Sequence, residues 1–268
     1  MIIDFHTHIF PDKMAEKTIA FLSEKGGIPS FSNGTAAGLV DKMKEAGVDI
    51  SITLPVLTNP AQFESVNNFA IGINQAFANA SPRLISFAGI HPQCEDIDNK
   101  MRFIKENGFL GVKIHPDYQQ TFIDDEGYVK IMQCAKEYDL IVVTHAGVDV
   151  GYKDKVHCTP ERALGLIRKV PHSKFVLAHL GGVEMSEQVI DTLCGEDVYF
   201  DTAYVLRYTS KDTFYRMLEK HGSDKILFAS DSPWSDMNED VKIIKSFGLD
   251  KNTEEKIFCE NAKLLLGM

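Results

Sequence analysis

Residues 140–145 read LIVVTH, a continuous run of apolar and β-branched residues that ends in a histidine. β-Branched side chains favour strands, and a run without polar alternation indicates a strand covered on both faces, as in a parallel sheet. The same kind of run recurs along the chain: IIDF near residue 2, VDISITLP near 48, LISFAGI near 84, LGVKI near 110, KFVLAH near 174, DVYFDT near 197 and KILFAS near 225. The sequence therefore predicts a series of buried strands.

The segments between these runs have the spacing of helices. Successive runs start about 32 residues apart, which is room for a strand, a helix and two loops. Apolar residues recur at helical spacing in 35–47, 99–108, 127–139 and 159–170, and a further helix is predicted near 252–266. Gly47 is a typical helix stop, and Thr159 followed by Pro160 is a typical helix start.

Alternating strand and helix units predict an α/β fold, a (β/α)8 TIM barrel with an eight-stranded parallel core, formed by a single domain over residues 1–268. The competing fold, a doubly wound open sheet, needs a glycine-rich phosphate loop after its first strand. This chain has HTHIFPDK (6–13) in that place. Residues 25–34, KGGIPSFSNG, are expected to be an irregular excursion between two helices, either a lid or a dimer contact.

Charge and cysteine content restrict the partners and the compartment. Asp and Glu number 38 against 28 Lys and Arg, for a formal net charge of −10. This balance argues against a nucleic-acid partner and still allows a local basic pocket for a small anion. The five cysteines include no CxxC pair, which is typical of reduced thiols. With no signal peptide and no bilayer-spanning apolar run, we expect a cytoplasmic protein without a membrane partner.

Chemically active side chains gather where the predicted strands end. In barrel enzymes the active site lies at the carboxyl ends of the strands. The residues that end predicted strands are His6, His8, His91, Lys113, His115, His145, His179, Asp201 and Asp231. The other histidines, His157, His172 and His221, lie elsewhere. We expect the residues of the first group to meet at one face of the barrel.

A metal site is the simplest interpretation of this gathering. His6 and His8 lie two apart on a strand, so their side chains point to the same side. Imidazole and carboxylate groups bind Zn²⁺ and similar ions, and His145, His179 and Asp231 add to the set. A metal lowers the pKa of a bound water and polarises a substrate oxygen, while a neighbouring carboxylate can deprotonate that water. The alternative for an isolated HxH is a pair of histidines on an exposed edge strand.

Four motifs in order along the chain resemble the amidohydrolase superfamily: HTH (6–8), THAG (144–147), AHLGG (178–182) and ASDSPW (229–234). The branch that they resemble most contains aminocarboxymuconate semialdehyde decarboxylase. The resemblance implies one divalent metal ion, with Zn²⁺ preferred over Mn²⁺, Co²⁺ or Fe²⁺. It also suggests a homodimer, since barrels of this branch often form dimers. The metal ligands that it implies are His6, His8, His145 and Asp231. It makes His179 the acid or base beside the metal, with Asp231 sharing in the activation of water.

Neighbouring families match less well. Polymerase-and-histidinol-phosphatase barrels end in an Asp-x-His element, where this chain has DSP (231–233). TatD-like nucleases carry a glutamate on the fourth strand, where this chain has Lys113. A non-enzymatic binding protein would be expected to have a broken ligand set, and here every ligand position is filled.

The residues that bind substrate are less sharply defined. Binuclear members of the superfamily have a carboxylated lysine or a glutamate on the fourth strand, so Lys113 is either a carboxylated metal bridge, a cation for a substrate carboxylate, or a structural residue. His115, Arg207 and Trp234 are further candidate substrate contacts, although Arg207 could equally be an exposed surface residue. The lesser candidates are His91, which is either a pocket residue or a strand cap, and Tyr152 and Lys153.

The predicted function is metal-dependent hydrolysis of a small amide, lactone or ester by metal-activated water. The alternative is a carboxy-lyase, which decarboxylates an unsaturated or aromatic carboxylic acid without oxidation. The two activities use the same ligands, and the substrate in both is a small molecule, expected to be anionic. Production of CO₂ distinguishes them.

Overall fold

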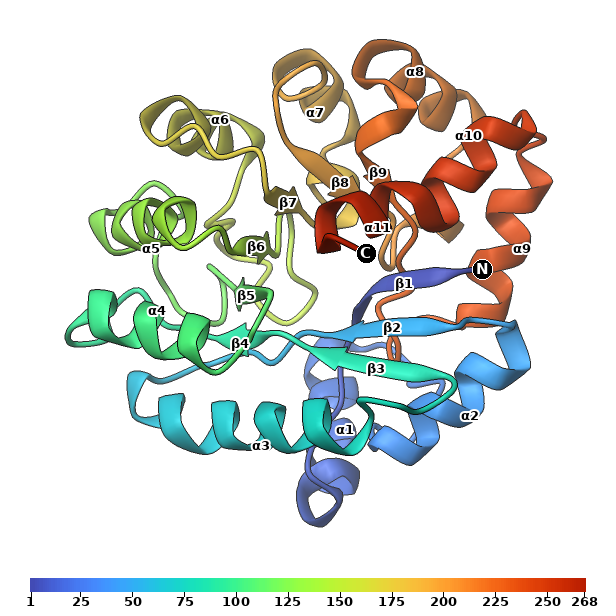
Figure 1. Cartoon of the computed structure of the whole chain (residues 1–268). Coiled ribbons are helices and arrows are strands. Elements are labelled where there is room, and N and C mark those ends of the chain that lie inside the picture. Colours follow the sequence, from blue (N-terminus) through green and yellow to red (C-terminus); the bar gives the residue numbers. More distant parts are fainter.

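The computed structural model describes residues 1–268. Its strands are all parallel to their neighbours and are arranged around a central axis, with helices outside them (Figure 1). Two hydrogen-bonded sheets contain them, in the orders β1-β2-β3 and β4-β5-β6-β7-β8-β9. The strands are β1 (Ile3–Thr7), β2 (Ile50–Thr53), β3 (Arg83–Ser86), β4 (Ala88–Gly89), β5 (Gly111–Ile114), β6 (Ile141–Thr144), β7 (Phe175–Leu177), β8 (Tyr199–Asp201) and β9 (Ile226–Leu227).

The two sheets join into a closed barrel. β3 and β4 are one predicted run, interrupted at Phe87 alone. On the other side, β1 lies beside β9: the Phe5 amide donates to the Phe228 carbonyl at 2.9 Å, and the Asp231 amide donates to the His6 carbonyl at 2.8 Å. The predicted (β/α)8 barrel is therefore confirmed.

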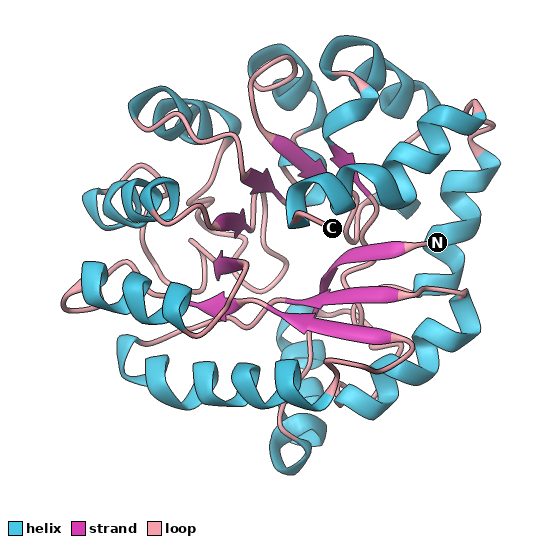
Figure 2. Ribbon diagram, viewed as in Figure 1, coloured by secondary structure: helices cyan, strands magenta, loops and turns pink.

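Helices cover the outside of the barrel (Figure 2). The predicted helix ends are confirmed at two places: Gly47 adopts the left-handed conformation after α2, and the Thr159 hydroxyl accepts from the Arg162 amide at the start of α6. The helices are α1 (Asp12–Gly26), α2 (Ala36–Ala46), α3 (Phe63–Ala76), α4 (Ile97–Glu106), α5 (Glu126–Glu137), α6 (Pro160–Lys169), α7 (Ser186–Thr192), α8 (Lys211–His221), α9 (Met237–Ser246), α10 (Lys251–Glu255) and α11 (Asn261–Leu266). None of them is long and apolar enough to cross a membrane.

Alternation along the strands divides the core into two layers. In β6, Ile141 and Val143 belong to the cluster inside the barrel, while Val142 belongs to the larger cluster between strands and helices. The same alternation in β5 sends Val112 and Ile114 outward, which turns Lys113 toward the barrel interior. A charged side chain therefore lies inside the barrel, next to the apolar inner cluster.

One end of the barrel is closed by the C-terminal helix. Ala262, Leu265 and Leu266 of α11 belong to the inner apolar cluster, and Figure 1 shows α11 lying across the ring of strands. At the other end, the irregular stretch between α1 and α2 follows the predicted excursion, and the Phe31 amide donates to the Pro233 carbonyl at 2.7 Å. The carboxyl ends of the strands meet at this second end.

Candidate metal centre

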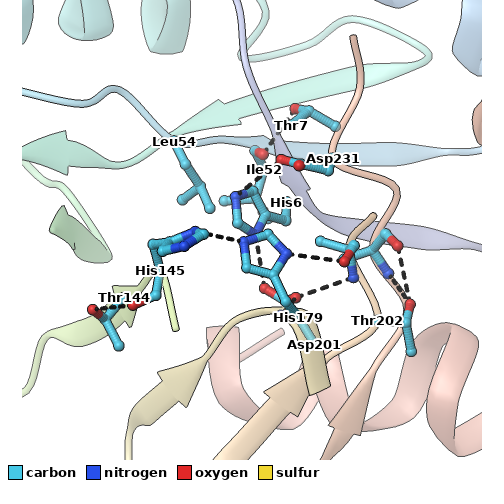
Figure 3. A network of polar contacts seen from close by, with 12 residues as sticks. His6, Thr7, Ile52, Leu54, Thr144, His145, His179, Asp201, Thr202 and Asp231 are labelled. Atoms are coloured by element: carbon cyan, nitrogen blue, oxygen red, sulfur yellow. Dashed lines mark hydrogen bonds and ion pairs between the residues drawn. The ribbon is translucent and has the colours of Figure 1, made fainter. Parts of the chain in front are cut away.

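Three of the four predicted ligands meet at the end of the barrel. The Nε2 atoms of His6 and His8, both from the end of β1, lie 3.1 Å apart. Asp231, which follows β9, places Oδ1 at 3.4 Å from His6 Nε2 and 3.2 Å from His8 Nε2. Figure 3 shows His6 and Asp231 in this network. Two ring nitrogens and a carboxylate oxygen thus converge on one point.

Outer partners fix which nitrogen of each ring carries the proton. His6 Nδ1 lies 2.8 Å from Asp201 Oδ2, and His8 Nδ1 lies 2.8 Å from the Leu54 carbonyl. Both partners are oxygen atoms that can only accept a hydrogen bond, so both Nδ1 atoms donate one. In a neutral ring, Nε2 then carries the lone pair. Burial and the Lys113 ammonium hold the pKa of His6 well below 6.5, so its ring is neutral at pH 7.

This arrangement fits a bound cation. Two ring nitrogens and a carboxylate oxygen face one another, and such acceptor groups repel unless a positive charge lies among them. Neutral imidazole and carboxylate are the donors preferred by first-row divalent metals. Hydrogen bonds to the outer nitrogens are the usual way to orient such ligands. The residues present therefore fit a divalent metal ion.

His179 and His145 lie beside this centre. His179 Nδ1 is 2.9 Å from the Ala203 carbonyl, and its Nε2 is 2.9 Å from His145 Nδ1 (Figure 3). Both side chains are buried. His145, the fourth predicted ligand, falls outside the group of His6, His8 and Asp231 and instead shares a second potential metal-binding group with His115 and Asp149. Its Nδ1 contacts His179, whose ring centroid lies 5.3 Å from that of His6.

Two of the site residues have strained backbones. His179 and Asp231 have φ values of 61° and 68°, in the left-handed region that costs a non-glycine residue about 1–3 kcal/mol. Strain of this kind collects at functional sites. Gly181, in the turn after His179, has φ 84°. Gly147 of THAG has φ 83°, and a Cβ there would lie 2.1 Å from the Val183 amide nitrogen, so the motif requires glycine.

Lys113 lies at the metal centre rather than at the surface. Its side chain is fully buried, and its Nζ is 3.1 Å from His6 Nε2. Burial lowers its pKa to about 8, against the opposing charges of Asp201 and Asp231. The Lys113 ammonium therefore contacts His6 Nε2, the same nitrogen that would bind a metal ion. Whether it bridges metals as a carbamate or contacts substrate stays a prediction.

The other candidate substrate residues are scattered. His115 is buried, stacks on His145 with ring centroids 4.3 Å apart, and lies 3.6 Å from Asp149. Trp234 is partly buried in the turn after Asp231. Arg207 is exposed and donates to the Ser235 hydroxyl at 2.6 Å.

The weaker candidates have structural contacts. His91 accepts from the Gln93 amide at 3.1 Å, as the strand-cap interpretation predicts. Tyr152 packs against Tyr118 and lies under Lys25 Nζ, whereas Lys153 is exposed.

Sequence analysis missed several acidic residues around the site. Asp201 was identified only as the end of a strand, yet it accepts from His6 Nδ1 and from the His179 amide at 2.8 Å each. Asp117 and Asp149 lie in loops after β5 and β6. Their position two residues beyond His115 and four beyond His145 was the available signal, but loop direction cannot be inferred from periodicity.

The comparisons identify relatives of this fold. A family model described as Amidohydrolase (Amidohydro_2) matches residues 3–268. No protein with a curated description matches the chain. Dihydroxybenzoic acid decarboxylase from a Polaromonas species, solved with manganese and 2-nitroresorcinol, is 17% identical with a TM-score of 0.76, over 99% of this chain and 96% of its own.

Two further structures show the range of activities among similar folds. 5-Carboxyvanillate decarboxylase from Sphingomonas paucimobilis is 15% identical with a TM-score of 0.73, over 100% of this chain and 99% of its own. A probable 2-pyrone-4,6-dicarboxylic acid hydrolase from Acinetobacter baumannii, with citric acid bound, is 18% identical with a TM-score of 0.69, over 100% and 99%. Among the similar structures, decarboxylases of aromatic acids are the more numerous.

Proposed function

The chain belongs to the amidohydrolase family, and we propose that it is a metal-dependent decarboxylase of a small aromatic or unsaturated carboxylic acid. The observation that carries the metal dependence is the convergence of His6 Nε2, His8 Nε2 and Asp231 Oδ1 within 3.4 Å of one another. The preference for decarboxylation over hydrolysis, which was the first expectation from sequence, rests on the decarboxylases among similar structures.

Residues of three strand ends hold the metal in this proposal. His6 and His8 contribute Nε2, Asp231 contributes Oδ1, and His145 contributes Nδ1 from the neighbouring loop. When bound, the ion supplies positive charge that anchors the substrate's oxygens and stabilises developing negative charge. Zinc, the metal expected from sequence, finds no support in the comparisons; two similar decarboxylases were solved with manganese. Mn²⁺ is therefore the first ion to test.

The proton step falls to His179. Its Nδ1–H is committed to the Ala203 carbonyl, so Nε2 is the nitrogen that faces the centre. In this proposal Nε2 takes up a proton from solvent, which makes the ring an imidazolium, and delivers that proton to the substrate carbon that bears the carboxylate. The carbon–carbon bond then breaks, its electron pair stays with the ring, and CO₂ leaves. The Lys113 ammonium, fully buried beside His6, provides positive charge that holds an anionic substrate in place.

A substrate panel tests the reaction. The Mn²⁺-loaded protein is incubated in D₂O with hydroxylated benzoic acids, of which 2,6-dihydroxybenzoate is bound in one similar decarboxylase. Release of CO₂ with deuterium at the vacated carbon supports the proposal. His179→Asn should lower the rate about 10²–10⁴-fold. The control, His172→Asn, changes a histidine before β7, at the opposite end of the barrel, and should leave the rate unchanged.

Hydrolysis is the second candidate, favoured by the similarity to a probable 2-pyrone-4,6-dicarboxylic acid hydrolase. The same panel extended to lactones, followed by acid release at constant pH, tests it directly. Lactone opening without CO₂ from any carboxylic acid would replace the decarboxylase proposal with this one. If protein that holds metal shows neither decarboxylation nor lactone hydrolysis, both proposed functions are contradicted.

A further inference from the structure

The rings around the metal centre each have a nitrogen that faces away from it. For His6 that nitrogen meets Asp201, for His8 the Leu54 carbonyl, and for His179 the Ala203 carbonyl. His145 is the exception, because its outer nitrogen, Nε2, is buried and has no hydrogen-bond partner. One ring of the site therefore lacks the outer contact that orients the others.

A carboxylate with a vacant oxygen lies opposite this nitrogen. Asp117 is completely buried, and its Oδ2 has no hydrogen-bond partner. That oxygen is 3.8 Å from His145 Nε2. The other oxygen, Oδ1, accepts from both the backbone amide and Nδ1 of His157, at 3.0 and 2.9 Å. His157 thus holds Asp117 in place with its free oxygen aimed at His145.

The number of protons on the two rings explains why His145 Nε2 and Asp117 Oδ2 are 3.8 Å apart and not hydrogen-bonded. A neutral imidazole carries one N–H. His145 Nδ1 faces His179 Nε2, which is a lone pair because the His179 proton points to Ala203. With both rings neutral and the His179 proton on Nδ1, this contact places the His145 proton on Nδ1, and Nε2 then carries a lone pair opposite a carboxylate. Two buried acceptors then face each other, and neither can satisfy the other.

We propose that Asp117, held by His157, is the positioning residue of His145. Asp117 accepts a hydrogen bond from His145 Nε2–H. This bond fixes the tautomer that carries its proton on Nε2, so that the lone pair lies on Nδ1, which binds the metal. This inference rests on the proposed function, in which His145 is a ligand through Nδ1. Closing the contact from 3.8 Å to about 2.9 Å needs a small slide of the ring. The His145 ring lies flat on His115, with 6° between the planes, so a shift of the ring within its own plane keeps the two rings parallel.

Two substitutions at Asp117 separate this role from a packing role. In Asp117→Asn the amide oxygen can still accept from His157, and its NH₂ then faces His145 Nε2, which forces the His145 proton back to Nδ1, against the metal. In Asp117→Ala water can accept from Nε2, so the useful tautomer survives. We expect Mn²⁺ affinity to decrease in the order wild type, Ala, Asn, with the Asn variant about 10–100-fold weaker than wild type. A packing role predicts the reverse order, because Asn has nearly the shape of Asp.

The assay is titration with Mn²⁺, following the free ion by electron paramagnetic resonance. The matched control is Asp124→Asn, a partly exposed carboxylate in the same loop that pairs with Arg162, and it should bind Mn²⁺ like wild type. Equal affinities for wild type and both Asp117 variants would overturn the inference, as would a milder effect of Asn than of Ala. Loss of one of two ions in both variants would also overturn it, by making Asp117 a ligand itself.

Ring ¹⁵N chemical shifts of His145 test the same inference without a substitution. In wild-type protein loaded with diamagnetic Zn²⁺, the proton should be on Nε2, whereas without metal it should be on Nδ1. A metal-loaded ring that keeps its proton on Nδ1 would overturn the inference and remove His145 from the ligands, while the proposed reaction at His6, His8 and Asp231 would still stand. Wild-type protein that binds no ion would overturn both.

Discussion

A buried acid behind the site gives a sharp prediction about stability and pH. Asp240, in the first turn of α9, is 1% exposed, and neither of its carboxylate oxygens has a hydrogen-bond partner. Burial raises its pKa to about 7, from 3.8, against the opposing pull of the nearby Ser235 hydroxyl and the Arg207 guanidinium. The folded protein therefore binds a proton at Asp240 more tightly than the unfolded chain does.

The sign and size of the effect follow from this difference. Because the pKa is raised on folding, the stabilising contribution is complete below pH 3.8 and is lost as pH rises to about 7. Each pKa unit corresponds to about 1.4 kcal/mol. Between pH 5 and pH 8 the wild-type protein should therefore lose about 2–3 kcal/mol of unfolding free energy through Asp240 alone.

Replacement by a neutral residue isolates this contribution. Asp240→Asn keeps the shape of the side chain and cannot ionise, so its unfolding free energy relative to wild type should rise by about 2–3 kcal/mol between pH 5 and pH 8. Urea denaturation followed by circular dichroism at both pH values measures this difference. Asp41→Asn, at an exposed position of α2, is the control and should show no such change. A difference between Asp240→Asn and wild type that is flat, or that falls with pH, would refute the reasoning.

Two further substitutions probe the centre and the loops that carry it. Asp201→Asn places an amide NH₂ against His6 Nδ1. It should weaken Mn²⁺ binding about 10–100-fold with little change in the thermal midpoint of unfolding. Unchanged affinity in a metal titration would show that Asp201 does not orient His6. Gly147→Ala forces a Cβ against the Val183 backbone in a left-handed position and should cost about 3 kcal/mol or more; a midpoint within about 1 °C of wild type would argue against that close approach.

The barrel could be predicted because its signals are local. A run such as LIVVTH carries its strand preference in its own residues, and β6 appears at Ile141–Thr144 as expected. The predicted third strand was divided at Phe87, which changes no connection. The positions of His6, His8 and Asp231 followed from the rule that barrel sites lie at strand carboxyl ends.

What the sequence could not provide are contacts between distant segments. The proton of His8 is fixed by the carbonyl of Leu54, and that of His179 by the carbonyl of Ala203. A carbonyl group is present in every residue, so no residue type signals such a partner. Asp117 reaches His145 only because a loop folds back, and loop direction depends on tertiary packing. Lys113 was predicted to end a strand, but neither its inward direction nor its 3.1 Å contact with His6 was predicted.

The central claim is that His6, His8 and Asp231 hold a divalent metal ion. Elemental analysis of protein purified without added metal or chelator, and again after Mn²⁺ is offered and excess is removed, tests it most directly. The account predicts about one ion per chain in the wild type and almost none in Asp231→Asn, since that change removes the only anionic ligand. Wild-type protein that holds no ion even after Mn²⁺ is offered, or an Asp231→Asn variant that holds as much as wild type, would contradict it.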